Sequence, residues 1–311
     1  MLVNFLGHAV GCRHSKFVEK YTLKNYMQSL ENLLAIARSV GWGASYLLRS
    51  YYTSQFHNAN LEIQDKQGDP VTSADLAVNH YILERLQTNL GEQEFAYISE
   101  ETYKLQSDKY SQPWVWIIDP LDGTRDFIEK TGEYAIHIAL VKDCRPVLAI
   151  VAYPEAEKLY YATLGGGTFV ESRDGKVTRL QVSNRNAIED FTLVVSRSHR
   201  DEKFNQLLQQ LPCKNQKSIG SIGCKIATVV EQQADLYISL SGKSAPKDWD
   251  LAAPELILTE AGGQFTHFDG TPLMYNQEDI NQWGGLLASN GQCHAQLCAE
   301  AERILTQLES K

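Results

Sequence analysis

The sequence predicts an α/β (α+β) protein, and three observations point to that class. An amphipathic helical pattern occupies residues 28–52, strand patterns with short connections follow one another between residues 95 and 170, and strands alternate with helices beyond Val182. Of the 311 residues, 43% are hydrophobic and 22% charged, which is ordinary for a globular chain with a sizeable core. We therefore expect a folded chain with at least one antiparallel or mixed sheet.

The first 26 residues have a weaker pattern than the rest of the chain. Met27 stands immediately before the strong helical pattern and is a candidate start of the folded part. We expect residues 1–26 to form a peripheral extension and residues 27–311 to form one domain. Its halves, 27–181 and 182–311, differ in their pattern of predicted strands and helices, but no low-complexity linker separates them. We expect these halves to share one interface rather than to fold independently.

Two helices are predicted before the first strand. Apolar residues recur at helical spacing over residues 30–51, which predicts a helix of roughly 25 residues with a core-facing stripe. A polar segment, residues 64–69, follows. Thr72 and Ser73 are candidate caps of a second predicted helix, which carries Leu76, Leu83, Leu86 and Leu90 and has Asp75 in its first turn. An acid there either complements the helix dipole or is a rigidly held functional carboxylate.

The central strand of the prediction is the apolar and β-branched run of residues 114–118. Asp119 stands where this strand ends, Asp122 follows three residues later, and Gly123 and Thr124 open a predicted helix. Carboxylates bind hard cations, and the N–H groups of a helix start bind phosphate oxygens. An ordinary capped Asp-Pro turn uses the same residue types, so this stretch alone leaves both interpretations open.

The remaining elements follow from the same patterns. A strand over residues 95–98 ends beside Glu100, at the end of a strand where open α/β sheets place their ligands. Glycines 165–167 predict the turn of a hairpin, and a helix over residues 250–261 begins at Asp250. The other predicted strands are 135–141, 147–153, 159–163, 168–170, 191–195, 236–240 and 285–288, and the other helices are 203–211, 222–231 and 297–308.

Charge and cysteine content narrow the class of function. The formal net charge of −9 argues against a nucleic-acid polymer as partner, because no basic stripe is available to neutralise phosphates. The six cysteines have neither metal-ligand nor disulfide-framework spacing, which favours a reducing compartment. No apolar run reaches the ~18 residues that a membrane helix needs. We expect a cytoplasmic protein, with peripheral attachment to a membrane left open.

Acidic residues recur at the ends of the predicted elements and carry the functional prediction: Asp75, Glu100, Asp119, Asp122 and Asp250. Together in one cleft they would repel one another strongly unless cations lay among them. Oxygen ligands favour Mg²⁺, Ca²⁺ or Mn²⁺ over zinc, and histidine is absent from these motifs. Two such ions ~3.5–4 Å apart can activate a water and stabilise the leaving oxygen at phosphorus.

Four stretches resemble the signatures of the inositol monophosphatase-like phosphatases, in the same order and with comparable spacing. They are residues 70–75 (PVTSAD), 99–101 (SEE), 119–124 (DPLDGT) and 249–253 (WDLAA). The resemblance covers about residues 28–310. It implies a layered αβαβα sandwich and a Mg²⁺-dependent, Li⁺-sensitive phosphatase with two or three Mg²⁺ ions, for which Mn²⁺ could substitute.

The resemblance implies a set of metal ligands. Glu100, Asp119 and the carbonyl of Leu121 would hold the first Mg²⁺, and Asp119, Asp122 and Asp250 would hold the second. Most of these ligands fall in the first half of the domain. The second half would supply Asp250 and the substrate contacts.

The resemblance also implies catalytic roles. Asp75 and Thr124 would act as a pair that, with Glu100, orients and deprotonates the attacking water. A hydroxyl between a carboxylate and a metal-bound water can relay a proton, so this role is chemically reasonable. The N–H groups of Gly123 and Thr124 would bind the phosphate, and Lys66 resembles the lysine that the family carries upstream of its first motif.

The choice of phosphate ester depends on a second anion site, which a bisphosphate nucleotide needs and an inositol monophosphate does not. The stretch 196–199 (SRSH) offers hydroxyls, a guanidinium and an imidazole, and the turn at 218–221 (SIGS) offers small residues next to Lys225. Both most resemble the 3′(2′),5′-bisphosphate nucleotidase branch, although Lys225 is displaced by about one residue and residues 223–224 are atypical. The expected substrate contacts are Gly123, Thr124, Ser196, His199, Gly220, Ser221, Lys225 and Asp250.

We therefore expect hydrolysis of the 3′-phosphate of 3′-phosphoadenosine 5′-phosphate, with its sulfated precursor as a second candidate substrate. An inositol-1-monophosphatase or a fructose-1,6-bisphosphatase with the same metal chemistry is the first alternative. A non-catalytic metal- or phosphate-binding protein is the second. The expected partner is a small phosphorylated molecule, and we expect a monomer or a homodimer.

Overall fold

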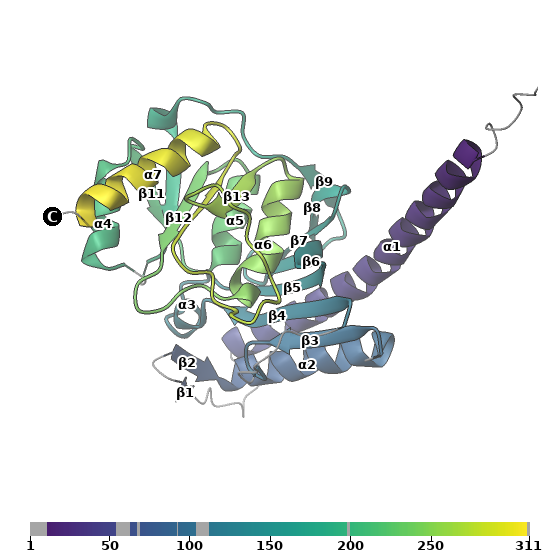
Figure 1. The fold of residues 1–311 in the computed structure, drawn as a ribbon. Coiled ribbons are helices and arrows are strands. Elements are labelled where there is room, and N and C mark those ends of the chain that lie inside the picture. The colour runs from purple at the N-terminus through teal and green to yellow at the C-terminus, as the bar shows by residue number, and fades with distance from the viewer. Residues whose placement is uncertain are drawn as a thin grey trace, which may run out of the picture.

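Helices and sheets alternate in five layers in the computed structural model (Figure 1). It describes residues 11–53, 63–66, 69–91, 93–103, 112–197 and 200–309, without the side chains of residues 11–29, 64–66 and 69–70. Three hydrophobic clusters separate the layers: one between the first helices and the larger sheet, one between the two sheets, and one beyond the smaller sheet. The predicted αβαβα sandwich is confirmed.

The first layer consists of α1 (Gly11–Tyr52) and α2 (Ser73–Leu90). Buried apolar side chains of both helices pack on one face of the larger sheet. The expected length of roughly 25 residues for the first helix is wrong, because α1 has 42 residues and begins at Gly11. No proline interrupts residues 11–52, so the helical hydrogen bonding continues upstream of the amphipathic stripe.

The larger sheet has seven strands in sequence order: β3 (Phe95–Ser99), β4 (Trp114–Asp122), β5 (Ala135–Lys142), β6 (Arg145–Tyr153), β7 (Lys158–Thr163), β8 (Gly167–Ser172) and β9 (Val177–Leu180). β3 runs parallel to β4, and the other neighbours are antiparallel. The glycines at 165–167 do form the turn of the β7–β8 hairpin, where the N–H groups of Gly165 and Gly167 donate to the Glu260 carboxylate, each at 2.8 Å.

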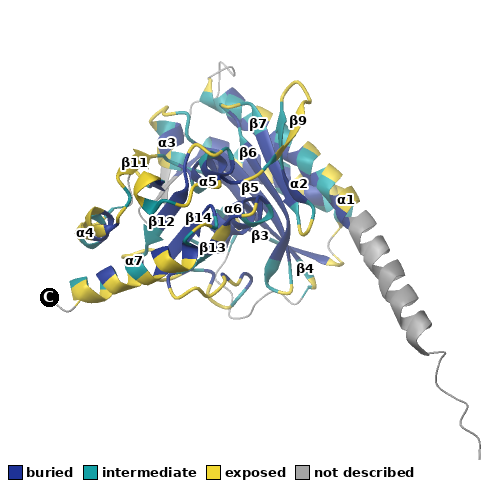
Figure 2. Ribbon diagram, turned by 90° about the horizontal axis from the view of Figure 1, so that it is seen from above, coloured by how far each residue is buried: buried dark blue, intermediate teal, exposed yellow. Residues whose placement is uncertain are grey.

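The third layer is formed by α5 (Ile222–Val230) and α6 (Asp248–Glu260), which lie between the two sheets. Both are almost entirely buried, as their dark blue ribbons in Figure 2 show. A helix that is apolar on most of its surface suits this position, because it contacts a sheet on each side. These helices join the two halves of the chain in one core.

The smaller sheet has the strand order β11 (Asn215–Ser218), β10 (Thr192–Val195), β12 (Leu236–Leu240), β14 (Gly285–Ser289) and β13 (Gln264–His267). β10 is parallel to both β11 and β12, and β14 is antiparallel to its neighbours. The outer layer is α4 (Glu202–Gln210) and α7 (His294–Glu309), and the short elements are α3 (Thr124–Ile128) and η1 (Ile188–Asp190).

Some strands lie where the sequence patterns predict none. β1 (Ile63–Lys66) and β2 (Asp69–Thr72) form a hairpin in place of the expected polar segment, and β9, β11 and β13 are also additional. β9 and β11 are largely exposed, and β13 begins with an exposed glutamine. Pairing with a neighbouring strand creates these elements, so an apolar pattern is not required.

Candidate active site

The parallel pairing of β3 and β4 brings acids together at one edge of the larger sheet. Ser99 is opposite Ile118, and the Glu100 N–H donates to the carbonyl of Ile118 at 3.2 Å. Glu100 therefore stands beside Asp119, which is 1% exposed. Burial raises the pKa of Asp119 well above its ordinary value, and the charges of Glu100, Asp122 and Asp250 raise it further. Acids from separate elements therefore lie close enough to Asp119 to influence its charge.

A bulge in β4 separates Asp119 from Asp122. The strand does not end at Asp119 as expected but continues to Asp122, with a register shift between a pairing of Asp119 with His137 and one of Asp122 with Ala135. Pro120 lies inside the bulge, where its missing N–H leaves no ladder bond unmade. The Leu121 N–H donates to Asp119 Oδ1 at 2.9 Å. The bulge thus turns two nearby carboxylates toward the same end of the strand.

Asp75 and Thr124 are in contact, although 49 positions separate them in the sequence. Asp75 forms a capping box with Thr72 at the start of α2, and its Oδ2 accepts from the Thr72 N–H at 2.8 Å and from the Thr72 hydroxyl. The Thr124 hydroxyl lies 3.2 Å from Asp75 Oδ1 and 3.1 Å from the carbonyl of Leu121. It has one proton, so it can donate to only one of them at a time. Burial raises the pKa of Asp75 to about 6 despite the Thr72 hydrogen bonds.

Asp250 reaches the same group from the first turn of α6. Its Oδ2 accepts from the Lys247 N–H at 2.6 Å. Burial, and then the charge of Asp122, raise the pKa of Asp250 to about 6. Burial and the charge of Asp250 raise the pKa of Glu100 to about 8, which the Lys247 charge opposes. The sequence analysis gave Lys247 no role. Only its position three residues before Asp250 could have indicated that it lies near these acids.

Asp122 behaves differently from the other acids. Burial by itself raises its pKa, but the charge and hydrogen bond of His137, the charge of Lys225 and a hydrogen bond from Ser221 outweigh it and lower the pKa to about 2. Ser221 Oγ donates to Asp122 Oδ2 at 2.6 Å, and the Gly223 N–H donates to the same oxygen at 2.9 Å. Asp122 therefore carries a charge that the protein itself balances.

His137 and Gly223 explain how the second half of the chain meets Asp122. His137 is fully buried on β5, with Nε2 3.2 Å from Asp122 Oδ2 and Nδ1 3.3 Å from the carbonyl of Trp249. A Cβ at position 223 would lie 2.4 Å from His137 Nε2, so α5 can approach β5 only with glycine there. The signal that sequence reasoning missed is a histidine at a buried position of an otherwise apolar strand.

The residues predicted to contact substrate have varied surroundings. Gly123 has φ +91° and precedes α3, and a Cβ there would lie 3.0 Å from the carbonyl of Glu133, so the turn requires glycine. Gly220 and Ser221 form the turn before α5, with Ser221 as its N-cap. Lys225 is buried, and its Nζ donates to the carbonyl of Gly220. It is enclosed by the protein rather than directed into an open site.

Ser196 and His199 were predicted to contact the substrate, and Lys66 to match the lysine upstream of the first motif. Ser196 follows β10, and its carbonyl accepts from Arg200 Nε at 2.8 Å. His199 lies outside the described residues, and so does the side chain of Lys66.

The donor set suits a hard divalent ion. Two buried acids, Asp75 and Asp119, and two half-buried ones, Glu100 and Asp250, have raised pKa values, because removal from water and then neighbouring negative charges disfavour their charged forms. A cation would offset both effects. In the described parts of the chain, no three acidic, histidine or cysteine side chains are yet arranged as they stand to hold an ion. The acids suit a divalent ion because the ligands that they offer are carboxylate oxygens whose charges influence one another.

The fold and these acids define a metal-dependent phosphatase, and the comparisons agree. A model of the inositol monophosphatase family matches residues 29–306, and the chain belongs to this family. Family membership implies a divalent metal ion as cofactor. In the described part of the chain, no helix is both long and apolar enough to cross a membrane.

Curated relatives support the assignment, and a solved structure has a similar fold. The chain is 36% identical over 220 residues to the 3′(2′),5′-bisphosphate nucleotidase CysQ of Salmonella typhimurium, covering 70% of this chain and 85% of that protein. It is 31% identical over 254 residues to the CysQ of Haemophilus influenzae, covering 80% and 89%. The IMPase of Thermotoga maritima has a similar fold, with a TM-score of 0.72 and 22% identity over 89% of this chain and 99% of that one.

We predict that metal-free protein loses stability as the pH rises from 5 to 8. Between about 4, where an unfolded carboxyl titrates, and the raised pKa values of about 6 for Asp75 and about 8 for Glu100, the folded state binds more protons than the unfolded state. Stability therefore falls with rising pH in this window. Melting curves in a chelator test this, with a shallower dependence expected for Glu100→Gln. Added Mg²⁺ should raise the melting temperature more at pH 8 than at pH 5. A metal-free melting temperature that climbs steadily from pH 5 to 8 would contradict the prediction.

We also predict that Gly223→Ala destabilises the protein by about 1–3 kcal/mol, the usual cost of overpacking. The new Cβ would meet His137 Nε2 at 2.4 Å and Val151 Cγ1 at 2.9 Å, both in the packed core. Denaturant unfolding measures the change. Thr228→Ala, at a half-buried position on the same helix, is the control and should cost much less. Equal stabilities of the two variants would show that α5 can shift without penalty.

Proposed function

We propose that the protein is a Mg²⁺-dependent 3′(2′),5′-bisphosphate nucleotidase that removes the 3′-phosphate from 3′-phosphoadenosine 5′-phosphate. The observation that carries the proposal is the set of buried and half-buried acids with raised pKa values, contributed by α2, β4, α6 and the end of β3. The CysQ relatives support the choice of ester. The sulfated precursor remains a second candidate substrate.

The proposed metal ligands are those that the sequence predicted. Glu100, Asp119 and the carbonyl of Leu121 would hold one Mg²⁺, and Asp119, Asp122 and Asp250 another. Backbone N–H groups fix one oxygen of Asp119 and one of Asp250, which restrains these side chains before an ion binds. A bound divalent ion supplies Lewis-acid charge to the phosphoryl group and lowers the pKa of a bound water. A count of two or three ions, and replacement by Mn²⁺, belong to the same proposal.

Thr124 and Asp75 are proposed to move the proton of the attacking water. Glu100 would orient that water, and the Thr124 hydroxyl would accept its proton while donating its own to Asp75 Oδ1. The 3.2 Å contact between Thr124 Oγ1 and Asp75 Oδ1 supports this direction. The raised pKa of about 6 for Asp75 suits a group that receives a proton near neutral pH.

An inositol monophosphatase with the same chemistry is the alternative, and the enclosed Lys225 is the observation that favours it. Its ammonium donates to the carbonyl of Gly220, so in this structure it does not offer a cation to a second phosphate. A cytoplasmic location, a monomeric or homodimeric state and inhibition by Li⁺ remain predictions.

A panel of phosphate esters tests the proposed substrate. We expect kcat/KM for 3′-phosphoadenosine 5′-phosphate to exceed that for inositol 1-phosphate and fructose 1,6-bisphosphate by at least about tenfold, because a second anion contact is worth ~1.5 kcal/mol or more. Phosphate release at saturating Mg²⁺ measures this, and LiCl titrated into the same assay should inhibit. Preference for inositol 1-phosphate would favour the alternative, and inactivity toward all three esters would refute both.

Substitutions at Thr124 test the proton path. Thr124→Val keeps the side-chain shape but removes the hydroxyl, so kcat should fall by ~10²–10⁴, the usual contribution of a positioned proton-transfer group. Thr124→Ser keeps the hydroxyl and is the matched control, which should retain most of the turnover. Steady-state kinetics at saturating Mg²⁺ separate a loss of turnover from weaker metal binding. A Val variant as active as the Ser variant would remove the hydroxyl from its assigned role.

A further inference from the structure

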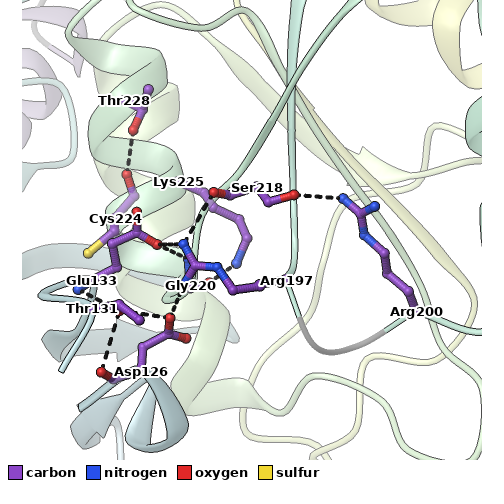
Figure 3. A network of polar contacts seen from close by, with 10 residues as sticks. All are labelled: Asp126, Thr131, Glu133, Arg197, Arg200, Ser218, Gly220, Cys224, Lys225 and Thr228. Atoms are coloured by element: carbon purple, nitrogen blue, oxygen red, sulfur yellow. Dashed lines mark hydrogen bonds and ion pairs between the residues drawn. The ribbon is translucent and has the colours of Figure 1, made fainter. Parts of the chain in front are cut away.

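Two arginines that follow β10, Arg197 and Arg200, have contrasting surroundings (Figure 3). Both are cations in the stretch that leads from the smaller sheet to α4. In the figure, Arg197 lies among the carboxylates of Asp126 and Glu133, whereas Arg200 reaches Ser218 from the other side. Their charges are therefore balanced to different extents, which bears on which one can bind an anion.

Arg197 is already neutralised by the protein. Its Nη1 is paired with the carboxylate of Asp126, and its Nη2 lies 2.7 Å from Glu133 Oε2. Glu133 Oε2 also accepts from the Gly220 N–H at 2.7 Å. Arg197 thus holds the turn that contains Gly220 against α3 and the segment before β5. A phosphate at Arg197 would have to displace two carboxylates, so this residue is poorly placed to bind one.

The partners of Arg200 among the described residues are neutral. Its Nε donates to the carbonyl of Ser196 at 2.8 Å, and its Nη2 donates to Ser218 Oγ at 3.1 Å. With the Gln216 amide oriented so that its oxygen faces the guanidinium, Nη2 donates to that oxygen at 2.8 Å and Nη1 donates to it at 3.3 Å. Of the carboxylates that the structure describes, none forms an ion pair with Arg200. Burial lowers the pKa of Arg200, and no acid opposes that shift.

The geometry around Arg200 leaves hydrogen-bond donors for an anion. The guanidinium has five N–H groups, and the contacts with described residues use four of them, so one N–H of Nη1 remains for an anion. Ser218 Oγ accepts from Arg200, so the hydroxyl proton of Ser218 can be donated to another acceptor. Planar guanidinium groups bind phosphate with charge-assisted hydrogen bonds, which are stronger than neutral ones.

Ser218, a hydrogen-bond partner of Arg200, is close along the chain to a residue that contacts the proposed reaction centre. β10 and β11 are parallel, and Val195 is opposite Ser218, so Ser196 and Ser218 lie together at the carboxyl edge of the smaller sheet, where such sheets bind ligands. Three residues later, Ser221 donates to Asp122. Three residues span at most ~10 Å, which is of the same order as the separation of two phosphates on one ribose.

We propose that Arg200, together with the Ser218 hydroxyl, binds the second phosphate group of a nucleoside 3′,5′-bisphosphate and so determines the preference for bisphosphates over monophosphates. The inference rests on the proposed nucleotidase function. It assigns the second anion contact to a cation that the sequence motifs did not single out. Lys225 and Arg197 are both occupied by groups of the protein itself.

Kinetics with two adenosine substrates test the assignment. For Arg200→Gln, KM for adenosine 3′,5′-bisphosphate should rise about tenfold to a hundredfold, the range expected for a lost charged hydrogen bond. Its kcat, and its KM for adenosine 3′-monophosphate, should stay within about twofold, because the lost contact involves only the distant phosphate. Arg200→Lys should restore part of the affinity. Lys203→Gln removes a neighbouring charge that is paired with Glu309, and it should match the unchanged protein.

An equal loss on both substrates, or no change on either, would overturn the assignment. Binding of adenosine 5′-monophosphate, measured by calorimetry, separates this inference from the proposed function because it requires no turnover. We expect Arg200→Gln to bind this nucleotide at least about tenfold more weakly. Equal binding by both proteins would refute the role of Arg200. If the unchanged protein bound it but hydrolysed neither adenosine substrate, the anion site would stand and the nucleotidase function would fall.

Discussion

The burial of Asp119 among other carboxylates, at the adjoining ends of β3 and β4, is the constraint on which the rest of the site depends. Asp119 is buried beside Glu100 and within the influence of Asp122 and Asp250, so its charged form is strongly disfavoured without a counterion. The backbone nevertheless holds Asp119 and Asp250 in place through N–H donors. Folding therefore prepares a group of acids that only protons or cations can balance, and this makes the site responsive to divalent ions.

Asp122 links this acidic group to the second half of the domain. Its charge is balanced by His137 from β5 and by hydrogen bonds from Ser221 and Gly223 at the start of α5. The same turn is held from the other side by Glu133, through its side chain to Gly220 and its carbonyl to Ser221. The segment that contacts Asp122 thus also contains Ser218, which we assign together with Arg200 to the second phosphate. The short segment of residues 218–223 therefore takes part both in holding Asp122 and in the proposed selection of the substrate.

The elements that the sequence predicted best are those whose stability depends on local pattern and burial. The strands β4 to β7 have strongly apolar runs, and the apolar stripe of α1 lies on the face that packs against the larger sheet. The exposed strands β9 and β11 were missed because hydrogen bonding to a neighbouring strand stabilises them without an apolar face. The continuation of β4 through its bulge was missed for a similar reason, since pairing with β5 decides where the strand ends.

The sequence by itself determined the family and predicted the acids of the proposed site, with their positions at the ends of helices and strands, because these are encoded in short motifs with local physical causes. Only the tertiary structure decided how each charge is balanced. His137 on β5 faces Asp122 on the neighbouring strand β4, and the charge of Lys247 partly balances that of Glu100. Arg197 is paired with carboxylates, whereas no described carboxylate pairs with Arg200. The physical reason is that the interaction of two charges depends on their distance in space and on their burial. The fold sets both by bringing together residues that are far apart in the sequence.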